Sequence, residues 1–173
     1  RRVGHTGTLD PMAEGLLLLC VGHATRLQQF LMRWEKTYRG VVRLGHATTT
    51  YDREGEIVDP RGGVPRLEAD LLAQLVSRFS GELEQVPPPY SAKKVAGRKM
   101  YELARHGEAI DLEAKRVMVH KLRLEATADD LLELEVTTSS GFYVRSLAHD
   151  IGCELGCGGH LHELQRTRIG PYR

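Results

Sequence analysis

The first fifteen residues contain a carboxylate that could act as a nucleophile. They read RRVGHTGTLDPMAEG, with Asp10 near the centre. The glycines permit unusual backbone angles and Pro11 biases Asp10 away from helix, so we predict a loop with a fixed, extended path. The apolar run at 16–21 predicts a fully buried strand that anchors this loop. A rigidly held acid suits covalent catalysis, although an Asp before Pro often only caps a turn.

The size and composition of the chain favour one domain. Its 173 residues, 41% of them hydrophobic, can bury a single core, so we expect one domain over residues 1–173. No apolar run approaches the roughly 18 residues that cross a membrane. Three cysteines, an odd and low number, fit a reducing cytoplasm better than secretion. Because the chain begins at Arg1 inside a motif, we expect its natural start to lie upstream.

Charge is segregated along the chain. The formal net charge is only +1, which by itself argues against a general nucleic-acid binder. Between residues 93 and 105, however, five basic residues and one glutamate give a local +4, whereas five acidic residues between 125 and 135 give −5. The basic segment could bind RNA phosphates, and the alternative is a solvated face. The candidate phosphate ligands are Lys93, Lys94, Arg98 and Lys99.

Hydrophobic periodicity predicts the elements that must position these groups. Apolar residues at helical spacing predict helices at 23–34, 67–79 and 100–107, and a last helix through Leu147, Ile151 and Leu155. Serine at 139–140 is a suitable N-cap for the last of these. Alternating apolar and polar residues predict strands at 36–45, 115–126, 131–138 and 158–170, the middle two as an antiparallel pair. Prolines and glycines predict irregular structure at 48–55, 59–65 and 87–89.

Several other chemistries are poorly matched. The chain has neither a phosphate-binding glycine loop ending in Gly-Lys-Ser/Thr nor a dinucleotide fingerprint, which argues against an ATPase or a dehydrogenase. A glycosidase would pair Asp10 with a second carboxylate, which no loop marks. Four soft ligands could hold zinc, but their spacing lacks the usual zinc knuckle. These ligands are Cys153, Cys157, His160 and His162.

Residues 4–11, which read GHTGTLDP, and Gly15 resemble the catalytic motif of the TruB-type tRNA pseudouridine synthases. In that family the aspartate is the nucleophile, a role that the resemblance assigns to Asp10. A tyrosine that opens a strand and stacks on the target base is matched by Tyr38. A Gly-x-Tyr-x-Arg motif leading into a helix is matched by GFYVR at 141–145, in which Arg145 would pair with Asp10.

The resemblance extends to further binding residues. It implies that Leu164 lines the uracil pocket, that His5 fills the space left by the flipped nucleotide, and that Tyr143 is a second aromatic contact. Residues 88–114 resemble the family's basic, thumb-like RNA-binding insertion. Two departures remain, since nothing here corresponds to the family's earlier Lys-Pro-x-Gly-x-Thr-Ser segment or to its C-terminal PUA-type domain.

The resemblance also implies a fold and an activity. The fold would be α+β (mixed α/β), with a central, largely antiparallel sheet flanked by helices. The activity would be isomerisation of the uridine at position 55, in the T-loop of tRNA, without metal or cofactor. The T-arm stem-loop would be the partner of a cytoplasmic monomer with no membrane or protein partner.

The implied reaction needs few chemical groups. It requires an ionised carboxylate, a cation that keeps it ionised, an aromatic platform and a dry pocket. The alternative is a non-catalytic RNA-binding or tRNA-chaperone module, and the presence of both Asp10 and Arg145 favours the enzyme. For Arg145 itself, the alternative is a residue that only decorates the helix surface.

Overall fold

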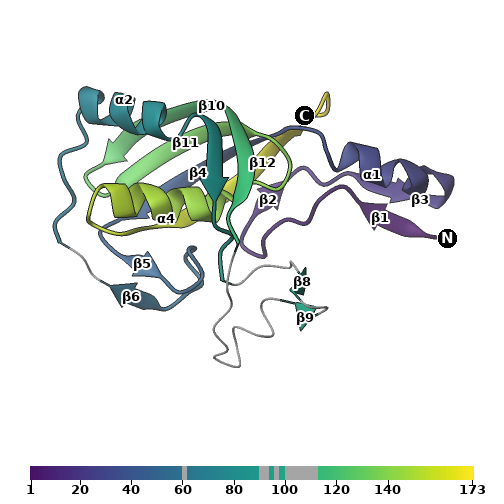
Figure 1. Ribbon diagram of the computed structural model, residues 1–173, viewed down its shortest axis with the longest axis horizontal. Helices are drawn as coiled ribbons and strands as arrows, with labels where there is room; N and C mark the ends of the chain where they lie inside the picture. Colours follow the sequence, from purple (N-terminus) through teal and green to yellow (C-terminus); the bar gives the residue numbers. More distant parts are fainter. Residues whose placement is uncertain (60–61, 90–93, 96–97, 100–112) are drawn as a thin grey trace.

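A six-stranded sheet forms the centre of the computed structural model, which describes residues 1–59, 62–89, 94–95, 98–99 and 113–173 (Figure 1). The strand order is β2-β12-β4-β11-β10-β7. All neighbours pair antiparallel except β2 and β12, which are parallel. The α+β prediction with a largely antiparallel sheet is therefore confirmed. The strands are β2 Glu14–Gly15, β4 Lys36–Leu44, β7 Gly81–Gln85, β10 Lys115–Ala128, β11 Leu131–Thr138 and β12 Gly159–Ile169.

The alternating sequence of β11 explains how the sheet is packed. Leu132, Leu134 and Val136 are buried on one face, while Glu133 and Glu135 between them are exposed. This is the pattern of a strand with one face on the core and one in water. The predicted antiparallel pair at 115–126 and 131–138 is confirmed as β10 and β11.

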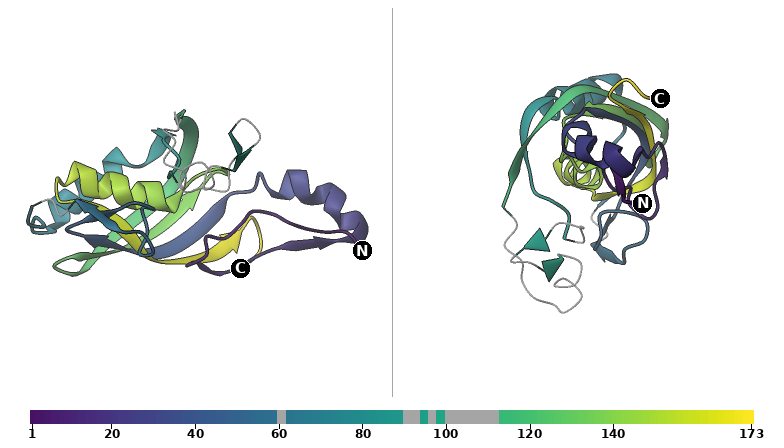
Figure 2. Two further views of the ribbon diagram at one scale, coloured as in Figure 1. Left: turned by 90° about the horizontal axis from the view of Figure 1, so that it is seen from below. Right: turned by 90° about the vertical axis from the view of Figure 1, so that its right-hand side faces the viewer.

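Two helices cover the buried face of the sheet. Helix α2 (Ala69–Arg78) packs near β10, and α4 (Val144–Glu154) lies in the concave face of the curved sheet (Figure 2). Leu147 and Ile151 of α4 are fully buried, as their spacing predicts. The prediction of a serine N-cap is wrong, because the N-cap residue of α4 is Tyr143 and no side chain caps the helix. Gln85 instead accepts a hydrogen bond from Tyr143 N at 2.8 Å.

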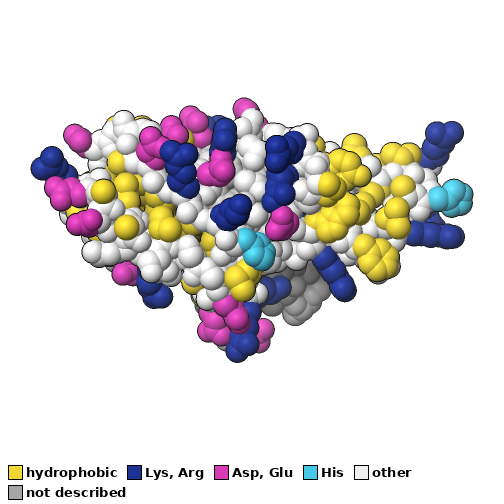
Figure 3. Space-filling model, turned by 90° about the horizontal axis from the view of Figure 1, so that it is seen from above, with side chains coloured by type: hydrophobic (Ala, Val, Ile, Leu, Met, Phe, Trp, Pro, Cys, Tyr) yellow, Lys and Arg dark blue, Asp and Glu magenta, His cyan; other side chains and the backbone are white. Residues whose placement is uncertain are grey.

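The N-terminal segment projects beyond this sheet as a short hairpin of β1 (Val3–His5) and β3 (Leu19–Val21). The fully buried strand predicted at 16–21 is wrong, since only the last three residues form a strand and Leu19 is 61% exposed. The physical reason is that β3 pairs only with β1, in a two-stranded sheet of its own. Apolar side chains consequently gather at the surface of this end (Figure 3).

The segment after β3 is helical, but it is shorter and more exposed than predicted. A 3₁₀ helix, η1 (Gly22–Leu27), passes into the four-residue α1 (Gln28–Leu31). Phe30 is 58% exposed, so the apolar spacing at 23–34 does not face the core. Among the described residues, no helix is long and apolar enough to cross a membrane.

Two small sheets complete the described structure. Strands β5 (Ala47–Thr48) and β6 (Ile57–Asp59) flank the predicted loop at 48–55. Strands β8 (Lys94–Val95) and β9 (Arg98–Lys99) form a hairpin inside the predicted insertion at 88–114. The helix predicted at 100–107 lies outside the described residues. The extent of the insertion and the single domain stay predictions.

Candidate active site

The loop that carries Asp10 is held against the last strand of the sheet. Gly15 and Arg166 are Cα partners in the parallel pairing of β2 and β12, and Leu16 N donates to Arg166 O at 2.8 Å. A side chain at position 15 would not fit, because its Cβ would lie 2.3 Å from Arg166 O, and φ at Gly15 is +100°. Ala13 N donates to Asp10 O at 2.9 Å, which closes a turn after the acid.

Asp10 and Arg145 form a bidentate ion pair. Arg145 Nε donates to Asp10 Oδ2 at 3.1 Å, and Arg145 Nη2 donates to Asp10 Oδ1 at 3.0 Å. The arginine side chain is only 6% exposed, whereas that of Asp10 is 30% exposed. The structure thus brings together two predicted site residues that lie 135 positions apart. Parallel hydrogen bonds of this kind fix the direction of a carboxylate as well as its charge.

Sequence reasoning missed a third member of this network, Asp52. Its side chain is 5% exposed, and its Oδ2 accepts from Arg145 Nη1 at 3.3 Å. Arg145 Nη1 also donates to Thr50 O at 2.9 Å. Asp52 Oδ1 accepts from Glu54 N at 3.0 Å, which holds the carboxylate in place. The only feature of the sequence that pointed to a functional residue here was the polar composition of the loop at 48–55, and it did not distinguish Asp52 from its neighbours.

An aromatic stack fastens the loop of Asp52 to α4. The rings of Tyr51 and His149 are parallel within 6°, with centroids 3.8 Å apart. Tyr51 has a φ of +64°, which a tyrosine rarely adopts without support from its surroundings. Burial raises the pKa of the Tyr51 hydroxyl. His149 follows Arg145 by one helical turn, so the stack and the ion pairs lie on one side of α4.

Tyr38 and Leu164 lie on two neighbouring strands of the sheet, β4 and β12. Tyr38 is on β4, where its Cα partner on β12 is Arg166. Burial raises the pKa of the Tyr38 hydroxyl, the charge and hydrogen bond of Arg166 lower it, and the charge of Asp10 raises it. Leu164 is 6% exposed and faces Gly40 across the strand pair. Tyr38 therefore lies close enough to Asp10 to sense its charge, and Leu164 is buried on the neighbouring strand.

The remaining predicted residues are more dispersed. His5 lies on β1, where its Nδ1 accepts from Gly7 N at 3.4 Å, and it is exposed. Tyr143 stands at the start of α4, half-buried, two residues before Arg145. Of the predicted phosphate ligands, Lys94 belongs to β8 and Arg98 and Lys99 belong to β9. Lys93 lies outside the described residues.

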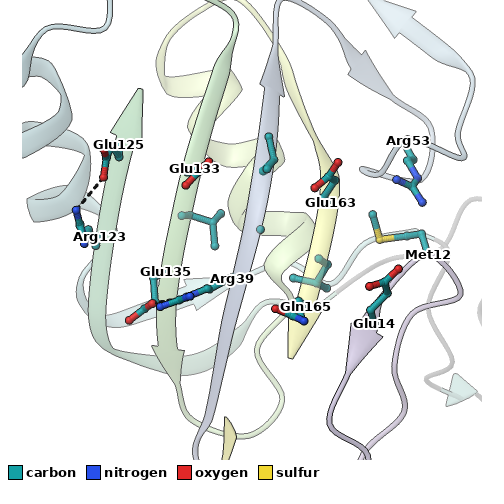
Figure 4. Close-up of a pocket in the computed structure, with 14 residues that line it drawn as sticks. Met12, Glu14, Arg39, Arg53, Arg123, Glu125, Glu133, Glu135, Glu163 and Gln165 are labelled. Atoms are coloured by element: carbon teal, nitrogen blue, oxygen red, sulfur yellow. Dashed lines mark hydrogen bonds and ion pairs between the residues drawn. The ribbon is translucent and has the colours of Figure 1, made fainter. Parts of the chain in front are cut away.

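A polar hollow lies on the opposite face of the sheet, and of the predicted site residues that the structure describes, only Leu164 is among those that line it. Its volume is about 620 Å³, and Figure 4 shows α4 behind the strands that line it. Arg39, Glu135 and Glu163 project into it, and Arg39 Nε donates to Glu135 Oε2 at 2.7 Å. Neither Asp10 nor Arg145 lines this hollow. A search for concave surfaces alone would thus have missed the Asp10 site.

The zinc alternative finds no support in the described structure. Within residues 1–59, 62–89 and 113–173, no three His, Cys, Asp or Glu side chains gather as metal ligands would. Cys157 is buried and donates to Gly158 O, whereas Cys153 is exposed. His160 Nδ1 lies 3.3 Å from His46 O, a backbone group.

Asp150, on α4, provides a stability prediction. Burial raises the pKa of its carboxyl to about 6. The folded protein then binds more protons than the unfolded chain between about pH 4 and 6, so this residue makes stability fall as pH rises through that range. Asp150→Asn should raise the thermal midpoint at pH 7.5 by a few degrees, and the gain should vanish near pH 4. Thermal unfolding of the parent and the Asp150→Asn protein between pH 4 and 7.5 measures this difference in midpoint.

A matched control is Glu154→Gln at the C-terminal end of the same helix. Its side chain is 50% exposed and its nearest described cation, Arg78 Nε, is 4.0 Å away. An exposed pair of this kind contributes little, so the midpoint should hardly change at either pH. If Asp150→Asn gave the same gain at pH 4 as at pH 7.5, ionisation of Asp150 would not be the cause.

The chain is similar to known proteins over its full length. Residues 1–144 match the family model described as "TruB family pseudouridylate synthase (N terminal domain)", and residues 145–173 match "tRNA pseudouridylate synthase B C-terminal domain". The tRNA pseudouridine synthases B of Francisella tularensis subsp. tularensis (strain WY96-3418) and Francisella philomiragia subsp. philomiragia are each 44% identical over all 173 residues. The chain spans 57% of the length of these curated relatives.

Solved structures show the same fold. The chain superposes over its full length on 42% of a chain in a Cbf5-Nop10-Gar1 complex, with a TM-score of 0.72 and 29% identity. A chain in an H/ACA RNP bound to a substrate RNA containing 2'-deoxyuridine gives a TM-score of 0.68 and 27% identity, with all of this chain and 40% of that one covered. From its matching family models and its relatives, the chain belongs to the TruB family of pseudouridylate synthases.

Proposed function

We propose that this chain carries the catalytic centre of a tRNA pseudouridine synthase that isomerises the T-loop uridine at position 55. The observation that carries the proposal is the bidentate contact between Arg145 and Asp10, at 3.1 and 3.0 Å. It supplies a carboxylate with a fixed direction close to Tyr38, with Leu164 buried on the strand beside that of Tyr38. The names of the relatives, tRNA pseudouridine synthase B, support the same substrate class.

Each residue has a proposed role in this reaction. The N-glycosidic bond between N1 and C1′ breaks, the uracil turns, and a carbon–carbon bond forms between C1′ and C5. C5 then loses its proton and N1 gains one, so the reaction is an isomerisation with no net oxidation or reduction. Asp10 acts as the nucleophile and Arg145 orients it, while Tyr38 and Leu164 hold the base.

The target uridine must leave the T-loop before it can reach Asp10. Extrusion of a base costs a few kcal/mol, which protein contacts have to offset. We assign this work to His5, Tyr143 and the basic segment at 93–105, with the protein acting as a cytoplasmic monomer on the T-arm. His5 suits this role because it is exposed on the hairpin that begins the Asp10 loop.

The direct test is incubation of the protein with an unmodified T-arm stem-loop. Pseudouridine has the mass of uridine, so the product is labelled chemically before detection by mass spectrometry. We expect label at the position-55 uridine and none when cytidine replaces it. Stem-loop binding without any labelled product would favour the non-catalytic RNA-binding module instead.

A second prediction concerns the basic segment. Replacing Lys93, Lys94 and Lys99 together by Ala should weaken stem-loop binding and flatten its dependence on salt. Each lost phosphate contact reduces the slope of log affinity against log salt by roughly 0.7–0.9. Binding isotherms between 50 and 200 mM salt, a range of about fourfold, measure the slope. The control is Arg66→Ala, since this exposed residue pairs with Glu68 just before α2. An unchanged slope in the triple variant would make the segment a solvated face.

A further inference from the structure

Arg166 is buried beneath the Asp10 loop and is absent from the roles assigned so far. Its residue is 1% exposed, among the least exposed charged groups described. We propose that Arg166 is a positioning residue, which holds the Asp10 loop and the Tyr38 hydroxyl in one fixed arrangement. This inference rests on the proposed function, because the arrangement it maintains is that of the proposed catalytic groups.

The guanidinium contacts the loop on both sides of Asp10. Arg166 Nη2 donates to Gly7 O at 3.1 Å and Nη1 approaches Thr8 O at 3.4 Å, before the acid in sequence. Nε donates to Leu16 O at 2.8 Å, after the acid. The rigid planar fork of arginine can meet three carbonyls at once, which the single ammonium of lysine cannot do in the same directions. The span of loop that carries Asp10 is therefore fixed at its two ends by one side chain.

A buried charge without a counter-ion in the described structure, such as that of Arg166, is unusual for a residue that only stabilises the fold. No described carboxylate lies within ion-pair distance of it, so its partners there are neutral carbonyls. Lys36, a second buried basic residue, senses this charge, because burial and the charge of Arg166 lower the pKa of its ammonium to about 8. Burying a charge without a counter-ion is energetically unfavourable. Such a cost is commonly retained where it serves a functional site.

The same guanidinium reaches the proposed base platform. Burial raises the pKa of the Tyr38 hydroxyl, and the charge and hydrogen bond of Arg166 oppose this rise. Arg166 and Tyr38 are Cα partners on the neighbouring strands β12 and β4, so their side chains can meet on one face of the sheet. One residue thus couples the ring that holds the base to the loop that carries the acid.

Arg168 is the matched comparison on the same strand. It lies two residues further along β12, and its Nε donates to Thr37 Oγ1 at 3.2 Å. Its Nη2 pairs with Glu35 at 2.5 Å, and its side chain is 30% exposed. None of its described hydrogen bonds reaches the Asp10 loop. Arg168 therefore shares the residue type and strand of Arg166 without the positioning contacts.

The test compares Arg166→Lys with Arg168→Lys in single-turnover assays at saturating T-arm stem-loop. Misplacing reacting groups by about 1 Å costs roughly 10²-fold in rate, so we expect a loss of ten- to a hundredfold in Arg166→Lys. Its stem-loop dissociation constant should stay within about twofold of the parent's, and Arg168→Lys should match the parent in both. A parental rate in Arg166→Lys, with only a lower thermal midpoint, would overturn the proposal.

A second variant keeps the proposal testable if Arg166→Lys fails to fold. Gly15→Ala leaves Arg166 intact but pushes the loop away from it, since the new Cβ would meet Arg166 O. We expect the same slower turnover with retained binding, and parental turnover would again count against Arg166. If the parent protein itself makes no pseudouridine, the proposed function fails instead.

Tyr38 ionisation provides a readout that does not depend on activity. The absorbance titration of Tyr38, isolated by subtracting the Tyr38→Phe protein, should move to higher pH in Arg166→Met because the lowering contact is lost. An unmoved titration would show that Arg166 does not act on Tyr38.

Discussion

Asp10→Asn should bind the T-arm stem-loop as the parent does and form no detectable pseudouridine. The change keeps the size of the side chain and most of its hydrogen bonding to Arg145, but it removes the negative charge that makes a nucleophile. Removal of a nucleophile commonly costs more than about 10⁴-fold in rate. Single-turnover assays with labelled product detection, alongside binding isotherms, measure both quantities.

Glu14→Gln is the control for this experiment. Glu14 lies four residues after Asp10 in the same loop and is exposed on β2, so loss of its charge should leave turnover unchanged. Clear product formation by Asp10→Asn would remove Asp10 as the nucleophile.

Arg145→Lys should bind RNA nearly normally yet turn over at least about 10²-fold more slowly. The guanidinium holds Asp10 through two nitrogens and Asp52 and Thr50 through the third. A lysine ammonium is a point charge, which can neutralise a carboxylate without fixing its direction. Loss of alignment at a reacting group is costly even when the charge is kept. Rates at saturating stem-loop, compared with dissociation constants, separate alignment from binding.

Arg39→Lys is the matched control for Arg145→Lys. Arg39 also forms a close arginine–carboxylate pair, with Glu135 at 2.7 Å, but its side chain is 68% exposed on the opposite face of the sheet. We expect the parental rate from it, because exposed pairs contribute little. Parental turnover in Arg145→Lys would show that the bidentate contact is dispensable.

The strands and main helices were predictable because their burial follows from one periodic pattern. The alternation of Leu132, Leu134 and Val136 located β11, and Leu147 with Ile151 located α4. The prediction of a buried strand at 16–21 was wrong, because an apolar stretch indicates a preference for burial but does not show whether another layer of the protein covers it. Leu19 is consequently exposed where a buried strand was expected.

The site was predictable only in part, and for a different reason. Motif resemblance, rather than spacing, supplied the pairing of Asp10 with Arg145. The role of Asp52 could not be predicted, because this residue lies in a polar loop and its contact with Arg145 joins positions 93 residues apart. Arg166 was not predicted because its contacts with the Asp10 loop are to backbone carbonyls, which every residue possesses. Contacts of these two kinds depend on the folded path of the chain and leave no pattern in sequence.

The position of β12 has a consequence for biosynthesis. This strand follows the other five strands of the sheet in sequence, yet it lies inside the sheet between β2 and β4. Until residues 159–169 have left the ribosome, β4 has an unpaired edge and the Asp10 loop lacks the strand that it docks on. We expect a nascent chain without β12 to be catalytically silent and prone to association through that edge, and to acquire activity only once β12 has inserted.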